Sequence, residues 1–166
     1  MKRRTALQVL AAPSLVLAQQ SDKPQFFNPA QMEMLAQLTG MIIPADDHSP
    51  GAREAKVDLF IDLMVAQSSA EVQEQWRSGL TLVDTEARNR SGKPFLKCDA
   101  AEQDRILAAM AAGEVDPKTD LEHFFARLKL MTVDGYYTSS IGIHRELQYK
   151  GNAVLSHFAG CSHSDH

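Results

Sequence analysis

The chain has 166 residues, of which 44% are hydrophobic and 23% charged, and its formal net charge is −4 at pH 7. This length suits one domain with its own hydrophobic core. Nucleic acid is disfavoured as a partner, because an acidic chain repels phosphate and no basic stripe interleaved with aromatic residues compensates. Cys98 and Cys161 are too few for a disulfide framework, although they could pair with each other in an oxidising compartment.

The first 18 residues are typical of an export signal. A positive start at Lys2, Arg3 and Arg4 precedes a mildly apolar stretch that ends in small residues, so we expect cleavage after Ala18 and a periplasmic protein. The stretch is too short to span a bilayer, and no later run reaches the ~18 apolar residues of a transmembrane helix. Removing the leader takes away three of the 17 basic residues, which leaves 14 basic and 21 acidic residues and a net charge of −7.

The N-terminal segment can be interpreted in three ways. Arg3 and Arg4, followed by Leu7, favour a twin-arginine signal, which exports proteins that have already folded. The general secretory route, which exports unfolded chains, is the first alternative. An uncleaved tail on a cytoplasmic protein is the second.

The first predicted helix follows a polar lead-in that ends in Phe26-Phe27. Asn28 is the expected N-cap, Pro29 takes the first helical position and Gln31 completes a capping box. The helix should end at Ile43, because a residue before proline is crowded out of the helical region. Apolar residues recur at three- and four-residue steps, which predicts one buried face. The expected inward residues are Met32, Leu35, Leu38 or Thr39, and Ile42.

The second predicted helix runs from about Pro50 to Gln67. Ser49 offers a cap oxygen, and Pro50 suits the first helical position because its missing N–H costs nothing there. The expected inward residues are Val57, Phe60, Ile61 and Met64.

Three later helices each begin with a capping-box pattern. The pairs are Ser68 with Glu71, Asp99 with Glu102, and Thr119 with Glu122. Gly92 and Gly113 are the expected C-terminal stops of the third and fourth helices. The expected inward residues are Val72, Trp76, Leu80, Val83 and Ala87 in the third helix, Ile106, Leu107 and Met110 in the fourth, and Leu121, Phe124, Phe125, Leu128 and Met131 in the fifth.

These elements predict an all-α protein with a single-domain bundle of about five helices. No segment alternates apolar and polar residues between turn residues, as a strand would. We expect the export signal in residues 1–18, the helical bundle in 19–140, and a docking segment with a Cys/His tail in 141–166. A short helix over Ala153–Phe158 is the one element expected in an otherwise irregular C-terminal segment.

Three blocks of the sequence resemble the gluconate 2-dehydrogenase subunit 3 family. They are Ile42–Val57, which contains Ile-Ile-Pro-Ala-Asp-Asp and Ser-Pro-Gly-Ala, then Ser91-Gly92-Lys93-Pro94-Phe95, and Phe124-Phe125 followed by Thr132–Tyr137. The resemblance implies a non-catalytic small subunit that stabilises a flavin-dependent (GMC-type) sugar or alcohol dehydrogenase and is co-exported with it. FAD would then belong to the catalytic subunit and haem c to a cytochrome c subunit. Beyond Ser140 the chain departs from the gluconate enzyme's own subunit, so the substrate stays open.

Cofactor motifs are missing from the chain itself. There is no G-x-G-x-x-G for a dinucleotide, no C-x-x-C-H for covalent haem, and neither H-E-x-x-H nor G-x-S-x-G. We therefore expect no catalytic residues and no redox cofactor on this chain.

The C-terminal tail carries the one candidate metal site. His157, Cys161, His163 and His166 supply three imidazoles and a thiol, which are good ligands for zinc or copper, and four is the number that a tetrahedral site needs. A periplasmic metal-binding or electron-relay protein is thus the alternative function. A contact with a partner near a redox centre and a merely polar tail are the other readings of this segment.

An aromatic and basic cluster ahead of the tail is the candidate docking surface. Exposed tyrosine and arginine are typical of interface hot spots. The cluster consists of Tyr136, Tyr137, Arg145, Tyr149 and Lys150.

For several other residues a structural role is the simplest interpretation. Asp46, Asp47 and His48 suit the positive end of a helix, with a metal, a proton relay or a partner contact as alternatives. Trp76 is expected to be a core anchor. Cys98 lies near a helix N-terminus, where a thiolate is stabilised, but an inert thiol is the plainer reading.

Overall fold

The computed structural model describes residues 23–152, and within this range all regular structure is helical. The elements are α1 (Pro29–Ile42), α2 (Gly51–Glu54), α3 (Val57–Ala66), α4 (Ala70–Ser91), a 3₁₀ turn η1 (Phe95–Lys97), α5 (Ala100–Ala111), α6 (Asp120–Tyr137) and a π-helical turn η2 (Gly142–Glu146). The all-α, single-domain prediction is confirmed. The expected leader, the short helix over Ala153–Phe158 and the Cys/His tail lie outside the described residues.

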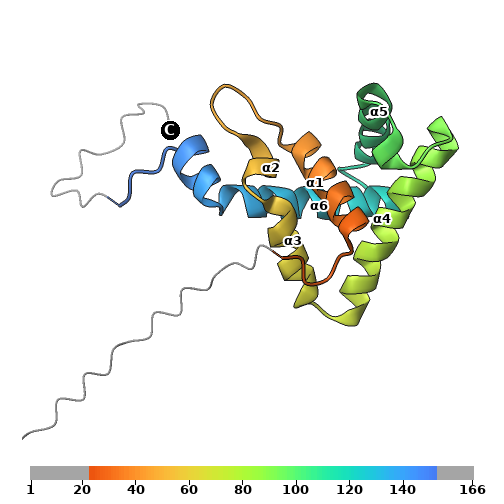
Figure 1. The fold of residues 1–166 in the computed structure, drawn as a ribbon, viewed down its shortest axis with the longest axis horizontal. Coiled ribbons are helices and arrows are strands. Elements are labelled where there is room, and N and C mark those ends of the chain that lie inside the picture. Colours follow the sequence, from red (N-terminus) through yellow and green to blue (C-terminus); the bar gives the residue numbers. More distant parts are fainter. Residues whose placement is uncertain (1–22, 153–166) are drawn as a thin grey trace, which may run out of the picture.

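Helix α6 is the centre of the bundle. It packs against α1, α2, α3, α4 and α5, and it runs through the middle of the molecule (Figure 1). Trp76 of α4 is buried beside it and meets the rings of Phe27 and Phe124 edge to face, with ring centroids 6.3 and 5.5 Å away. Gly79 makes room for this packing, because a Cβ there would lie 2.0 Å from Cδ2 of Phe124. Trp76 is therefore a core anchor, as predicted.

The predicted helix starts are largely confirmed, since capping is local chemistry. Asn28, Asp99 and Thr119 each form a complete capping box, and Gly92 ends α4 with a φ of 70°. The cap of α4 is Ser69 rather than Ser68, and it accepts a hydrogen bond from the Val72 N–H. Ser68 instead donates to the Met64 carbonyl and so completes the end of α3.

The second predicted helix is wrong as a continuous element. It is divided into α2 and α3, because Lys56 between them has left-handed backbone with a φ of 54°. Ser49 does not cap, since its hydroxyl hydrogen bonds with the hydroxyl of Tyr136, and Pro50 stands one position before the helix. The break also shifts the buried face of α3. Met64, expected inward, is 43% exposed, and Asp62 is buried in its place.

Helix α5 ends at Ala111 with Ala112 as its C-cap, so Gly113 directly follows the end of the helix, as predicted. The neighbour of Gly113 in space is the carboxyl group of Glu122. Helix α6, for which the sequence predicts no definite end, continues to Tyr137.

Candidate docking surface

The segment after α6 forms a compact hook, by which we mean residues 138–152. Its turn η2 packs on the end of α6. The Ser139 Oγ accepts a hydrogen bond from the Gly142 N–H at 3.0 Å, and the Tyr149 N–H donates to the Ile143 carbonyl at 3.0 Å. Gly142 has to be small, because a Cβ there would lie 2.1 Å from the Tyr136 carbonyl oxygen. The base of the hook is joined to α6 at Ser139, whose N–H and hydroxyl group both donate to the Tyr136 carbonyl, at 3.0 and 2.6 Å.

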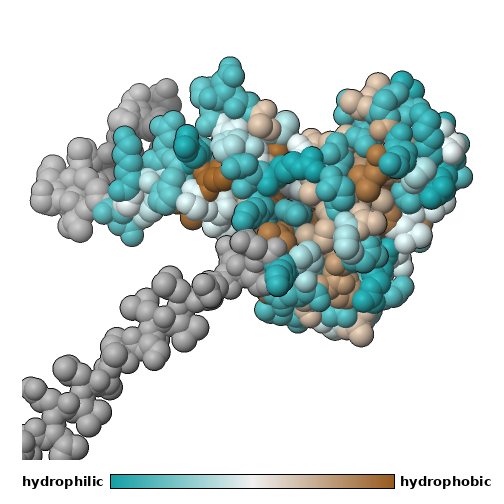
Figure 2. Space-filling model, viewed as in Figure 1, coloured by the Kyte–Doolittle hydropathy of each residue, from teal (hydrophilic) through white to brown (hydrophobic). Residues whose placement is uncertain are grey.

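Large apolar side chains are exposed around the hook. Tyr137 is 39% exposed, Leu147 57% and Tyr149 49%, and Arg145 and Lys150 are exposed beside them. Hydrophobic residues show among hydrophilic ones at this end of the molecule (Figure 2). The hook thus presents aromatic, aliphatic and basic groups together.

Tyr136 does not belong to this surface. It is 1% exposed, and its hydroxyl hydrogen bonds with Ser49 inside the bundle. Because α6 continues through this region, Tyr136 and Tyr137 point about 100° apart around the helix, and only one of them can face solvent. The prediction of Tyr136 as a docking residue is corrected on this ground, and Tyr137, Arg145, Tyr149 and Lys150 form the candidate surface.

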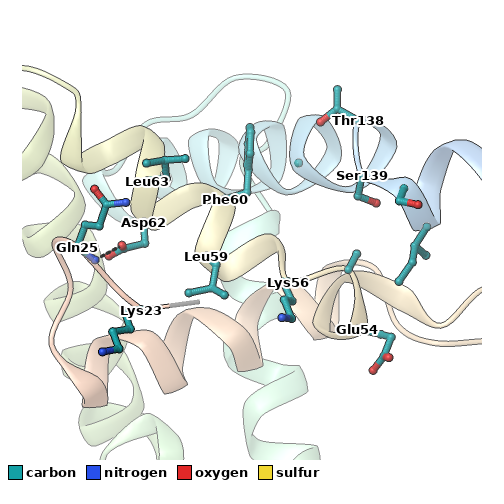
Figure 3. Close-up of a pocket in the computed structure, with 14 residues that line it drawn as sticks. Lys23, Gln25, Glu54, Lys56, Leu59, Phe60, Asp62, Leu63, Thr138 and Ser139 are labelled. Atoms are coloured by element: carbon teal, nitrogen blue, oxygen red, sulfur yellow. Dashed lines mark hydrogen bonds between the residues drawn. The ribbon is translucent and has the colours of Figure 1, made fainter. Parts of the chain in front are cut away.

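A groove of about 450 Å³ lies between α3 and the C-terminal end of α6 (Figure 3). Its large apolar side chains are Leu59, Phe60 and Leu63 from α3 and Ile141 from the hook, and Ala55 also lines it. Gly135 leaves room for Phe60, because a Cβ at position 135 would lie 2.6 Å from the Phe60 ring. The polar lining residues are Lys23, Gln25, Glu54, Lys56, Asp62, Thr138, Ser139 and Ser140. The groove and the hook share residues 138–141, so the two features are continuous.

Asp62 ties the N-terminal lead-in to α3. Its carboxylate is buried and accepts three consecutive backbone N–H groups, from Gln25 at 2.5 Å, Phe26 at 3.1 Å and Phe27 at 2.8 Å. The role of Asp62 is not apparent from local sequence patterns, because its partners lie more than 30 positions away. The available signal was one carboxylate inside the otherwise apolar run from Leu59 to Ala66.

The acidic turn between α1 and α2 has a structural role. The Asp46 Oδ1 accepts hydrogen bonds from the backbone N–H groups of Ser49 at 2.7 Å and His48 at 2.8 Å, and these bonds hold the pKa of Asp46 below its ordinary value of 3.8. Gly51 closes the turn with a φ of 75°, where a Cβ would lie 2.6 Å from the Ala45 nitrogen.

No candidate metal site is found in residues 23–152, since no three His, Cys, Asp or Glu side chains gather there. The predicted tail ligands His157, Cys161, His163 and His166, and the export residues Arg3 and Arg4, lie outside the described residues. Cys98 is buried, and its thiol points at the Pro94 carbonyl at 3.6 Å.

The family model for Gluconate 2-dehydrogenase subunit 3 matches residues 29–153, three quarters of the chain. The chain belongs to this family. Membership implies an accessory subunit of a gluconate 2-dehydrogenase complex, which places the chain with an oxidoreductase. The comparisons with curated proteins and with solved structures found no match. In the described part of the chain, no helix is both long enough and apolar enough to cross a membrane.

Proposed function

We propose that this chain is a non-catalytic small subunit that stabilises a periplasmic flavin-dependent (GMC-type) sugar or alcohol dehydrogenase. The family match over residues 29–153 carries the proposal. FAD would be bound by the catalytic partner and haem c by a cytochrome c subunit, so the contribution of this chain is the surface that it offers them.

The hook, together with Tyr137 at the adjoining end of α6, is the part of the surface best suited to such a partner. Tyr137 and Tyr149 present large, rigid rings at low cost in conformational entropy, and Arg145 can pair with a carboxylate. Because η2 packs on the end of α6, the hook is folded in the chain without a partner. A preformed surface loses less entropy on association than an unfolded tail.

Export of this subunit with its partner is a further part of the proposal. The Arg3-Arg4 pair supports a twin-arginine route, which would let a folded complex cross the membrane on one signal. Replacement of both residues by lysine should then leave the precursor in the cytoplasm. Unchanged secretion would favour the general secretory route.

The test of the docking role is co-purification from the native host. The tagged chain should retain a flavoprotein, detected by its FAD absorbance, and a Tyr137→Ala/Tyr149→Ala variant should lose most of it. Leu130→Ala is the matched control, because Leu130 is also exposed on α6 but lies outside the hook. Retention of no flavoprotein by the wild type would refute the accessory role. Equal losses in both variants would refute the hook as the docking site.

The alternative is a metal-binding or electron-relay protein that acts through the tail, favoured by the ligand set His157, Cys161, His163 and His166. Stoichiometric zinc or copper in the purified mature chain, lost in Cys161→Ser, would favour it. A Cys161→Ser chain that still retains the flavoprotein supports the accessory role.

A further inference from the structure

Helix α6 contacts five other helices, but one side of it faces solvent in the described part of the chain. Its buried residues gather on the other side and are Phe124, Phe125, Leu128, Thr132, Gly135 and Tyr136. At about 100° per residue, Leu130 stands at the middle of the side opposite to them, and it is 60% exposed. The solvent-facing side of α6 is thus centred on an aliphatic residue.

The apolar residues on this side follow the spacing by which two helices pair. Ala126, Leu130, Val133 and Tyr137 are separated by four, three and four positions, and we call them the seam. Leu130 and Tyr137 are exposed, Ala126 and Val133 are half-buried, and neither Leu130 nor Val133 packs against the hydrophobic core. A single exposed leucine is ordinary on a protein surface, whereas apolar residues that repeat at this spacing form one side of a helix–helix contact.

Two opposite charges lie along one edge of the seam. Arg127 and Asp134 each directly follow a seam residue and are seven positions apart, so they stand on the same edge two turns from each other. Among residues 23–152 neither has an ion-pair partner, whereas Lys129 of the same helix pairs with Glu114. The edge therefore suits a helix that presents the same two charges in the reverse order.

A second copy of α6 that runs antiparallel has a seam of the matching shape. A two-fold axis near Met131 brings Ala126 of one copy opposite Tyr137 of the other, so that a small side chain meets a large one. The same axis brings Leu130 opposite Val133. Each contact occurs twice, as two-fold symmetry requires.

The charges match in this arrangement as well. Arg127 of each copy comes within reach of Asp134 of the other, which gives two ion pairs along the edges of the seam. In a parallel pair, like charges would stand at the same level, so the charges favour the antiparallel arrangement.

We propose that the free subunit forms an antiparallel dimer through this side of α6. The contact is a single short helix pair, smaller than the ~1,200 Å² at the low end of stable interfaces, so the dimer dissociates on dilution. The proposal does not depend on the proposed function. Tyr137 belongs both to the seam and to the candidate docking surface, so a partner bound there would compete with the second copy.

The experiment is sedimentation equilibrium of the purified chain over a range of concentrations, under reducing conditions so that Cys161 cannot link two chains. Arg127→Asp sets two carboxylates against each other at both edges and should weaken the dimer about tenfold or more, as should Asp134→Arg. The double variant Arg127→Asp/Asp134→Arg restores opposite charges and should bring the dissociation constant back to within about threefold of the wild type. Arg105→Asp makes the same change of net charge on exposed α5 and should leave the dimer unchanged.

Leu130→Glu tests the apolar part of the seam without relying on the charges, and it should abolish the dimer while the helical circular dichroism is kept. A wild-type chain that stays monomeric at every concentration would overturn the inference. A dimer that survives Leu130→Glu or Arg127→Asp would do the same, because the contact would then lie elsewhere, and so would a double variant that is folded but does not recover. Retention of a flavoprotein is measured separately, so a monomeric chain that still retains it refutes the dimer alone.

Discussion

Asp62→Ala should be the most damaging single substitution among the polar residues of α3. The carboxylate is 1% exposed and accepts three backbone N–H groups that are 35 to 37 residues away in the chain. Water can reach the N–H of Gln25 in the variant, because that residue is exposed, whereas Phe27 is buried. One fully buried and one partly buried donor are then left without an acceptor, at about 1–3 kcal/mol each. We expect a loss of about 2–4 kcal/mol, a large fraction of the ~5–15 kcal/mol that stabilises a typical domain.

The assay is urea unfolding of the mature chain, followed by Trp76 fluorescence. This signal reports on the lead-in directly, since Phe27 packs on Trp76. Asp62→Asn should lose less than Asp62→Ala, because its carbonyl oxygen can still accept from Phe26 and Phe27. Its NH₂ group, however, faces the N–H of Gln25.

Asp58→Ala is the matched control on the same helix. Burial raises the pKa of Asp58, which means that the folded state disfavours its charged form, so removal of the carboxylate should cost no stability at neutral pH. If Asp62→Ala lowered the free energy of unfolding by no more than Asp58→Ala does, the lead-in would not depend on this carboxylate and the reasoning would be refuted.

Three further predictions concern the bundle. Gly79→Ala should lower the free energy of unfolding in urea by about 1–3 kcal/mol, because the new Cβ would meet the Phe124 ring. Gly40→Ala in α1, where the nearest atom of another element is 3.8 Å from the new Cβ, should raise it by about 0.5–1 kcal/mol. Equal effects of the two substitutions would contradict the packing of Gly79 against Phe124. Hydrogen bonds from the N–H groups of Lys118 and Thr119 hold the pKa of Glu122 below its ordinary value of 4.5, so its contribution is present above pH 4.5 and is lost as pH falls through the lowered pKa. The melting temperature of Glu122→Gln should accordingly fall less steeply with acid than that of the wild type, and parallel curves would count against this cap. In a Cys161→Ser chain, buried Cys98 should react with Ellman's reagent only after unfolding, whereas rapid reaction of the native chain would mean an accessible thiol.

Capping residues could be predicted from the sequence because their chemistry acts over three or four positions. Asn28, Asp99 and Thr119 each satisfy N–H groups of their own helix, so no distant part of the chain has to be known. The break at Lys56 has no such signal. Lysine rarely adopts left-handed backbone, and the turn is stabilised by packing of α2 and α3 on α1 and α6.

The candidate docking surface depends on contacts that are distant in sequence, so local patterns predict it only in part. Tyr137, Arg145, Tyr149 and Lys150 were predicted from composition and are exposed. The prediction is wrong for Tyr136, which is buried, because a pair of tyrosines does not reveal which ring faces the core unless the end of α6 is known. The acceptor role of Asp62 depends on residues 35 to 37 positions away, which no local pattern encodes.

The turn from Ile43 to Gly51 connects these features. This turn carries the strongest part of the family resemblance, yet in the described structure its polar groups bond mainly to one another: Asp46 accepts from His48 and Ser49. Its one long-range polar contact joins Ser49 to Tyr136, 87 positions later, at the end of α6 where the hook begins. Because Gly142 lies against the carbonyl of Tyr136, a shift of that residue would move the hook as well. The turn therefore acts as a brace that holds the end of α6 in place, where the proposed docking surface begins.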